Sequence, residues 1–512
     1  MKRFLKLSDS GGPKTPPKRR PEQPSKLVDC PLCGRAFLSA VVELHAGECQ
    51  DHLTQPATPK EENQNSSHTE EEKHSSCDSQ CEADRTIPGK SAGRTGAPNA
   101  LNVLMTAAAV VPRVEYFTCN MKGVVTCETL AERTETSAIE PRWEGQIEVF
   151  KNVHWQESQR KGSRVVLQSA APSAESLEAF YTACAQAACS SPWFRRSLAP
   201  HAEQWSRGRT ATKLSVGVLK SLLQKSIRRN MSCAAVFLTI EMLVKSRHDL
   251  FRRLPVIVLE DSFLHQDFAY LVWIMAACAK GFIPSTPHIR RLLMIVHQVA
   301  AVPYLDSVNS TNPEGEQAFD FESLDCSIQQ NTHRASTTLI RAMMYRADFG
   351  GMGGDIRMII RHAGFWSRRL RSNADAWLEL LAKIHQDGGR LACQTEAPER
   401  VTIPIAGVDF HCCPWMLDQI ESEADTGVVK RAMWECHSSI NHRKALPASK
   451  LEAVGITLPP EESAKRNDET SDDSRASNLI DVWQPIQDSV ESICSTFLRS
   501  RCPGIDLDVS GA

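Results

Sequence analysis

The sequence predicts a mainly α-helical protein, with a small antiparallel β-sheet on the N-terminal side of its helical body and a small ββα zinc finger on a disordered tether. Apolar residues recur at helical spacing over most of residues 171–455, whereas β-branched runs are concentrated in residues 101–170. Residues 28–51 also hold cysteines and a histidine at the spacing of metal ligands. These three observations separate a zinc-binding module, a β-rich subdomain and a helical body.

The composition is that of a soluble globular protein. With 512 residues, of which 41% are hydrophobic and 23% charged, the chain is long enough for two or three domains. The formal net charge of −2 gives no general attraction to nucleic acid, so such binding would have to come from local basic patches. The 18 cysteines follow no apolar signal sequence, which indicates reduced thiols inside the cell.

Residues 1–27 form a basic, proline-rich arm that we expect to be disordered. Its Lys18-Arg19-Arg20 run is typical of a nuclear localisation signal or of contacts to phosphate, and a merely soluble tail explains it as well. We therefore expect a nuclear protein. The longest uncharged apolar run, residues 268–279, is shorter than the roughly 20 residues that cross a bilayer, so we expect no membrane-spanning helix.

The residues that carry the clearest chemistry are Cys30, Cys33, His45 and Cys49. The Cys-x-x-Cys spacing lets a tight turn direct two thiolates to one point, and the histidine and last cysteine share one face of a helix that begins near Ser39. Three cysteines and one histidine close the tetrahedral site, so the expected Zn²⁺ ion is structural and stabilises the fold of the module. The alternative is four unrelated polar residues, which the two correct spacings disfavour.

At these residues the chain resembles the type-4 ubiquitin-binding zinc finger of DNA-repair proteins, over residues 28–51. That family has the pattern C-P-x-C, eleven residues, His, three residues, Cys, and the matching positions are Cys30, Pro31, Cys33, His45 and Cys49. The resemblance implies a short hairpin and one helix that docks on the apolar patch of ubiquitin.

The match departs from the family at one position. Many members carry an Asp two residues after the zinc-binding His, where it bonds the ubiquitin backbone, whereas this chain has Gly47. Glu48 or Asp51 could substitute for it. The apolar positions that could contact ubiquitin or form the core of the finger are Leu38, Val41, Val42 and Leu44.

The next two regions differ sharply in composition. Residues 52–100 are polar and rich in Ser, Gly and Pro, which predicts a disordered linker. Residues 101–170 are predicted to form the β-rich subdomain, with a hairpin over 114–119 and 124–129 and further strands over 146–153 and 164–168.

Residues 171–455 are predicted to form the helical body. An irregular, Trp-containing segment to about residue 212 should follow its first helix, and the almost wholly apolar helix 268–279 should be central. Its other predicted helices cover 173–190, 215–227, 234–242, 289–299, 337–347 and 374–385. Residues 456–477 are polar and acidic, hence expected to be disordered, and 478–500 should form a C-terminal helix interrupted at Pro485.

Part of the body, residues 215–265, resembles the helical region of the RarA and Werner-helicase-interacting ATPases. The matching positions are Lys225, Ser226, Arg228, Met242, Leu243, Arg252, Arg253, Leu254, Glu260, Asp261 and Leu264. No ATPase core precedes them, so the resemblance implies a helical fold and a replication or repair setting, and no activity. For Arg252, Arg253, Glu260 and Asp261 we favour ion pairs on or between helices over catalysis.

Three further groups suggest sites. The Gly-rich turn 348–355 could present amides to phosphate or simply join two helices, although Asp355 stands where an anion would bind. The following helix offers a nucleic-acid surface or a solvated face through Arg357, Arg361, Arg368, Arg369, Arg371 and Trp366. A second metal site, or only buried thiols, could be formed by His411, Cys412, Cys413, Cys436, His437 and His442.

Together these features predict a non-enzymatic adaptor that binds one Zn²⁺ and recognises ubiquitin, or a ubiquitinated protein, in the DNA damage response or replication-coupled repair. The flexible linker would raise the effective concentration of a weak single contact. The first alternative is a DNA-binding protein that uses the finger, the basic arm and the arginine-rich helix. The second is an enzyme within the helical body, for which the sequence offers no triad, carboxylate pair or open metal site.

Overall fold

The structure is a computed structural model that describes residues 27–29, 36–38, 114–130, 132–133, 141–148, 164–306, 308, 324, 328, 333–394, 399–456 and 473–509. The chain divides into two compact units, Met1–Gln55 and Pro56–Ala512.

In the first unit, two short strands form an antiparallel pair. Strand β1 (Leu27–Asp29) pairs with β2 (Ala36–Leu38), so that Leu27 lies opposite Leu38 and Asp29 lies opposite Ala36. The residues that join the strands, 30–35, include the Cys-x-x-Cys sequence. All four predicted zinc ligands lie outside the described residues, as do the arm 1–26 and the linker 52–100.

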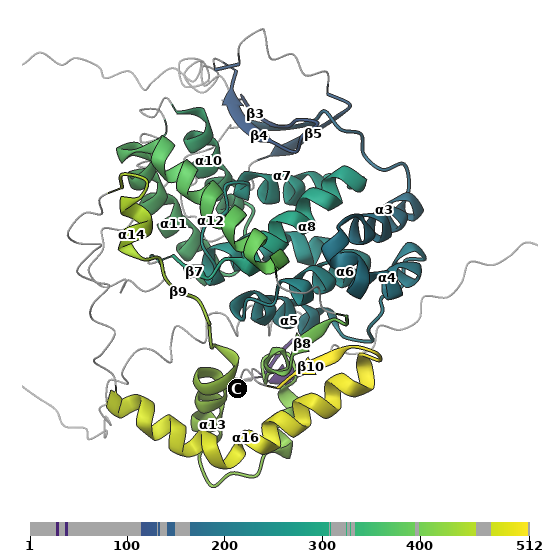
Figure 1. The fold of residues 1–512 in the computed structure, drawn as a ribbon, viewed down its shortest axis with the longest axis vertical. Helices are drawn as coiled ribbons and strands as arrows, with labels where there is room; N and C mark the ends of the chain where they lie inside the picture. Colours follow the sequence, from purple (N-terminus) through teal and green to yellow (C-terminus); the bar gives the residue numbers. More distant parts are fainter. Residues whose placement is uncertain are drawn as a thin grey trace, which may run out of the picture. The chain divides into compact units, whose positions relative to one another are not determined.

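The second unit is mainly helical, as the sequence predicted (Figure 1). Its helices are α3 (Leu177–Ser190), α4 (Pro192–Ser206), α5 (Val216–Arg228), α6 (Ser232–Asp261), α7 (Phe268–Ala279), α8 (Thr286–Ala301), α10 (Arg334–Asp348), α11 (Gly353–Ser372), α12 (Ala374–Gln394), α13 (Thr426–Met433), α14 (Ala448–Glu452) and α16 (Asp473–Arg501). Short turns of helix are η4 (Ile405–Gly407), η5 (Pro414–Gln419) and the π-helical η6 (Trp434–Ser438). Two short strand pairs are β7 (Tyr304–Leu305) with β9 (Lys444–Ala445) and β8 (Thr402–Pro404) with β10 (Asp506–Asp508).

The larger sheet has the strand order β4-β3-β6-β5. Its strands are β3 (Val114–Cys119), β4 (Val125–Thr129), β5 (Trp143–Glu148) and β6 (Arg164–Ser169). The prediction of a purely antiparallel sheet is wrong, because the central strands β3 and β6 run parallel. These two strands have the most buried residues and therefore take the centre, while β4 and β5 pair antiparallel at the edges.

The sheet packs directly on the helices of the same unit. The indole Nε1 of Trp273 in α7 donates a hydrogen bond to the Phe117 carbonyl of β3, at 3.0 Å. The amide of Cys127 in β4 donates to the Thr338 hydroxyl of α10, at 3.2 Å. Almost every residue of α7 is buried between the sheet and other helices, which confirms that this apolar helix is central.

The segment after α3 corrects a second prediction. It was expected to be irregular, but residues 192–206 form α4, with a proline in its first turn, where the missing N–H costs nothing. The helix also contains Pro200, which removes one backbone donor without ending it. Near the end of the helix the buried indole of Trp205 donates a hydrogen bond to the Glu241 carboxylate of α6, at 2.6 Å. This bond holds the end of α4 against α6.

The C-terminal helix corrects a third. Helix α16 begins at Asp473, inside the segment expected to be disordered, and it continues through Pro485, which lies on its exposed side. The buried stripe of α16 contains Trp483, Ile486, Val490, Cys494 and Leu498, at the spacing of one helix face. The helix therefore packs on the body, and beyond it β10 pairs with β8 in parallel.

Candidate functional site

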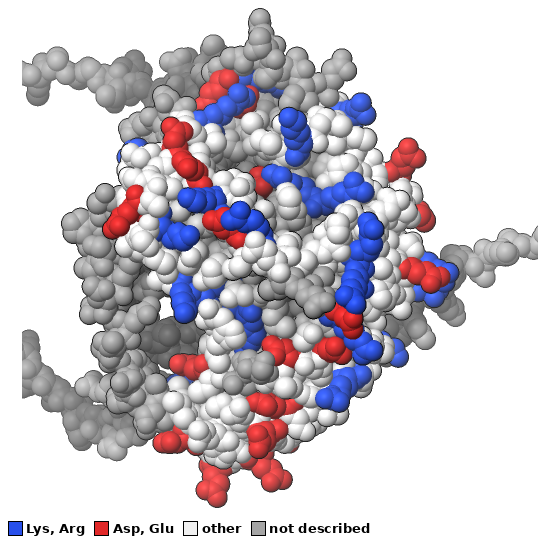
Figure 2. All heavy atoms as spheres, viewed as in Figure 1, with Lys and Arg blue, Asp and Glu red and all other residues white. Residues whose placement is uncertain are grey.

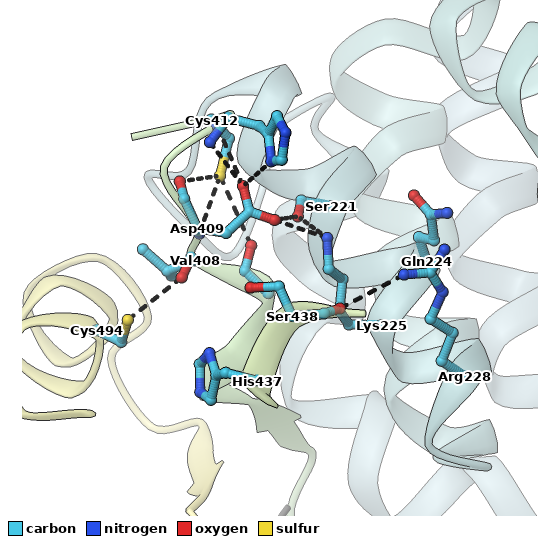
Figure 3. A network of polar contacts seen from close by, with 12 residues as sticks. Ser221, Gln224, Lys225, Arg228, Val408, Asp409, Cys412, His437, Ser438 and Cys494 are labelled. Carbon is cyan, nitrogen blue, oxygen red and sulfur yellow. Dashed lines mark hydrogen bonds and ion pairs between the residues drawn. The ribbon is translucent and has the colours of Figure 1, made fainter. Parts of the chain in front are cut away.

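A network of buried charges connects α5 with the end of α6 and with the segment 402–445. Figure 3 shows its contacts between α5 and the segment 402–445. Four polar side chains of α5, Ser221, Gln224, Lys225 and Arg228, are spaced three, one and three residues apart and so lie along one part of the helix surface. On a surface helix they would face water. Here Gln224, Lys225 and Arg228 are buried and Ser221 is half-buried, and only 4% of the Lys225 side chain is exposed.

Lys225 is paired with Asp409, whose side chain is 2% exposed, at a distance of 2.7 Å between Nζ and Oδ2. The Lys225 ammonium also donates to the Ser221 hydroxyl at 3.1 Å, and the backbone amide of His411 donates to the second Asp409 oxygen at 2.9 Å. Burial by itself raises the pKa of Asp409, but Lys225 and His411 outweigh it and hold the pKa well below its usual range. The carboxylate is therefore ionised and fully paired.

Arg228 is bonded to the two acidic residues at the end of α6. Its Nε donates to Asp261 at 2.5 Å, and its Nη2 lies 3.3 Å from a Glu260 oxygen. Burial opposes the charge of Arg228, but these carboxylates outweigh it and raise the pKa of the guanidinium. Arg253 extends the network, with Glu260 at 3.2 Å and Asp355 of α11 at 3.3 Å. The predicted ion pairs of Arg253, Glu260 and Asp261 are thus confirmed.

Arg252, the remaining arginine of the predicted group, is exposed and is not a member of the ion pairs named above. The Arg252 backbone carbonyl accepts a hydrogen bond from Arg346 at 2.9 Å. Arg346 also donates to the carbonyl of Gly350 at 2.8 Å, in the turn before α11 where Gly350 has a φ of 86°. Because Asp355 occupies the first turn of α11 and pairs with Arg253, this Gly-rich segment serves as a tight connection between helices.

Two arginines fasten the segment 434–445 to the helices. Arg443 donates to the last carbonyls of α8, with 2.9 Å from Nη2 to Val299 and 2.9 Å from Nε to the Val302 carbonyl. Burial lowers the pKa of Arg443 to about 9. Arg229 donates to the His437 carbonyl at 2.8 Å. Satisfying carbonyls at a helix C-terminus with a cation is stabilising, so both contacts support the fold.

The geometry of the network favours a structural role. Its most buried members are each paired with an opposite charge, and Glu260, whose side chain is 36% exposed, faces two arginines. A nucleophile or general base must instead reach a substrate with its lone pair available. Sequence reasoning missed Asp409, because a pairing across 184 residues leaves no spacing signal.

The predicted second metal site is not assembled. Cys412 and the Asp409 backbone hydrogen-bond each other, His411 packs its ring against Phe410 and Trp434, and the His437 ring stacks on Trp483 with 5.3 Å between centroids. No group of three metal-ligating side chains comes together anywhere in the described ranges. Cys413, Cys436 and His442 therefore join no such cluster.

The predicted nucleic-acid surface on α11 is only partly a surface. Arg369 is buried and pairs with Asp306 at 2.9 Å, and the buried indole of Trp366 donates to the same carboxylate at 3.0 Å. Neither is available to a nucleic acid. Arg357, Arg368 and Arg371 are exposed, and Arg361 is half-buried.

The charge distribution gives no continuous basic face in the view of Figure 2. Lys and Arg are interspersed with Asp and Glu over the helices, and the lower end, over α13 and α16, is mostly acidic. Interspersed signs weaken the field that would attract a polyanion. This view therefore gives little support to a broad DNA-binding face on the body.

The chain matches no protein-family model, and no curated protein or solved structure is significantly similar to it. The two resemblances at residues 28–51 and 215–265 therefore stay predictions. Within the part of the chain that the structure describes, no helix has the length and apolar character needed to span a membrane.

Proposed function

We propose that the chain is a zinc-dependent, ubiquitin-binding adaptor in the DNA damage response or in replication-coupled DNA repair, located in the nucleus. The observation that carries the proposal is the ligand set Cys30, Cys33, His45 and Cys49, whose Cys-x-x-Cys half lies between the paired strands β1 and β2. A two-stranded ribbon that presents two thiolates from its connecting turn is the usual first half of a ββα zinc module.

In this proposal the zinc ion holds the helix near residues 39–49 against the ribbon, and the apolar residues of that helix dock on ubiquitin. The protein thus needs no chemistry of its own, which is consistent with a body whose buried charges are paired. The body serves as the anchor that supplies a second contact.

Direct DNA binding is the second candidate function. The specific observation in its favour is that Arg357, Arg368 and Arg371 are exposed on α11, in a chain that also has the basic arm 1–27. Such binding would weaken steeply with salt, whereas docking on an apolar ubiquitin patch would not.

The test uses the full zinc-loaded chain, added unlabelled to isotopically labelled ubiquitin at two salt concentrations. We expect NMR shifts in the apolar patch of ubiquitin that persist at the higher salt. A parallel titration follows a fluorescent DNA duplex by anisotropy.

Two matched variants locate the contact. Cys30→Ser removes a predicted zinc ligand and should abolish the ubiquitin shifts, while Cys393→Ser, which replaces an exposed thiol of α12, should leave them unchanged. The proposal fails if ubiquitin is unaffected by the wild-type chain. DNA binding that is salt-sensitive and present without any ubiquitin shift would establish the second candidate instead.

A further inference from the structure

A surface pocket lies between the β3–β4 turn and the N-terminal half of helix α8, outside the network of buried charges described above. It has a volume of ≈ 300 Å³. The lining residues are Asn120, Met121, Lys122, Gly123, Ala171, Tyr270, Pro287, His288, Arg290, Arg291 and Met294. Three of these side chains are basic and no carboxylate is among them, so the pocket has a cationic lining.

The wall formed by the turn is held in place by local hydrogen bonds. The Asn120 side chain accepts from the amides of Lys122 and Val124, at 2.9 and 3.0 Å. Gly123 has a φ of 77°, and a Cβ at this position would lie 3.3 Å from the Arg291 Cγ atom. Glycine is therefore what lets the turn lie against α8.

His288 contributes a buried donor. It is 3% exposed, and its Nδ1 accepts a hydrogen bond from the Ser285 amide at 3.4 Å, so the neutral ring carries its proton on Nε2. Burial lowers the pKa of His288 to about 4, which keeps the ring neutral at physiological pH. Within the described residues, this buried Nε2 has no hydrogen-bond partner.

Arg291 contributes a second buried donor. Its Nη2 is paired with Asp267 at 2.5 Å, whereas its buried Nε has no hydrogen-bond partner among the described residues. A buried polar group without a partner costs free energy that an acceptor on a ligand would recover. The pocket also lies at the N-terminus of α8, where the helix dipole favours negative charge.

We propose that this pocket binds a phosphate monoester. The oxygens of the dianion accept from Arg291 and His288, the exposed side chains of Lys122 and Arg290 supply further positive charge, and the apolar remainder of the ligand packs on Met294. The geometry favours phosphate over a neutral ligand for two reasons. The His288 Nε2 and the Arg291 Nε lack an acceptor among the described residues, and the pocket carries three cationic side chains, of which Arg291 is already paired with Asp267. This inference does not depend on the zinc finger.

The test measures binding of three probes to the full chain by calorimetry: phenyl phosphate, inorganic phosphate and an N-acetylated phosphoserine amide. We expect phenyl phosphate to bind more tightly than inorganic phosphate, because Met121 and Met294 present exposed apolar surface at the pocket. A small aromatic phosphate and a phosphorylated peptide carry the same phosphate monoester group. The probe that binds more tightly, phenyl phosphate or the phosphoserine amide, shows which of these two ligands the pocket takes.

Variants on exposed residues keep the test independent of folding. The double variant Lys122→Glu/Arg290→Glu should weaken phosphate binding about tenfold or more. Its control, Lys444→Glu/Arg499→Glu, makes the same charge change at exposed residues of β9 and α16 and should bind like the wild type. Met294→Ala should weaken phenyl phosphate and leave inorganic phosphate unchanged. The proposal is overturned if no probe binds, or if the two double variants bind equally well.

Discussion

The two units of this chain differ in what their sequences predict. In the first unit, four residues at fixed spacing predict a metal site, because four ligands must meet at one point, and the resemblance at these residues implies a fold and a partner. In the second unit, hundreds of residues predict helices and a core, and none of them predicts a reaction. The contrast teaches that residue spacing can predict a binding site where ligand chemistry fixes the geometry, and predicts only the fold where apolar packing does.

The units should also differ in what stabilises them. A module of about twenty residues is too small to bury a sufficient core, so its folding should depend on zinc. The body instead buries a large apolar core and seals ion pairs such as Lys225–Asp409 within it. The predictions below separate these two sources of stability.

The largest expected effect is that of metal removal. A zinc chelator should unfold the finger completely, because structural zinc contributes about 10–16 kcal/mol in such modules, and should abolish ubiquitin binding. The melting temperature of the helical body should not change. The measurements are ubiquitin NMR shifts and calorimetry on the same sample, with added zinc as the reversal control. A body that melts earlier after chelation would contradict this division.

Breaking the buried network should destabilise the helical body and leave ubiquitin binding unchanged, which is the reverse of the effect of metal removal. Asp409→Ala leaves the Lys225 ammonium buried without its partner, and removing one member of such a pair costs about 3–5 kcal/mol. Urea unfolding of the body should shift accordingly, while binding to ubiquitin is retained. Asp418→Ala, at an exposed residue of η5, is the matched control and should change little. Equal effects of the two variants would show that the network is not a source of stability.

Sequence patterns predicted much of this fold because local rules determine it. Helix α7 was predicted from its apolar run, α5 from its apolar stripe, and the β3–β4 hairpin from its two β-branched runs. The cap of α5, in which the Ser215 hydroxyl accepts from the Val218 amide at 3.3 Å, was not predicted. The pairing of strands far apart in the sequence was missed. The parallel pairing of β3 with β6 depends on which strands are most buried, and the sequence pattern of a single strand does not give this. The prediction interrupted α16 at Pro485 and expected no helix at α4, which contains Pro200. In both helices packing outweighs the loss of one hydrogen bond.

The candidate sites likewise include some that the sequence predicted and some that depend on contacts between distant parts of the chain. The ion pairs of Arg253, Glu260 and Asp261 were predicted from charge and helical context. Arg369 and Trp366 were predicted on a surface, yet Asp306 draws both into the core from a distant part of the chain. The pocket at His288 and Arg291 had no signal in the sequence, because its walls come together only in the fold.

Acid should destabilise the body by a smaller amount per residue. Burial lowers the pKa of His362 to about 4, so the folded protein does not take up the proton that the unfolded chain binds near pH 6.5. A depressed histidine pKa gives stability that is present above pH 6.5 and is lost as the pH falls toward 4. Between pH 7 and 5 this one residue should cost about 2 kcal/mol.

The measurement is the free energy of unfolding in urea at both pH values. His362→Gln cannot take up the proton, so its pH dependence should be flatter than that of the wild type by that amount. His68→Gln, which lies in the linker predicted to be disordered, is the control and should keep the wild-type slope. An unchanged slope in the His362 variant would show that its ring titrates normally in the folded protein.

The smallest effect is expected where ion pairs face water. Arg207 and Glu203 of α4 form a surface pair at 2.6 Å, with both side chains largely exposed. Screening and side-chain entropy leave such a pair worth about 0.5 kcal/mol or less. Glu203→Gln should therefore shift the urea midpoint barely above the error, against the large shift expected for Asp409→Ala. If the two substitutions lowered the free energy of unfolding equally, burial would not be the reason why the Lys225–Asp409 pair stabilises the body. The expected difference between buried and exposed ion pairs would then be wrong.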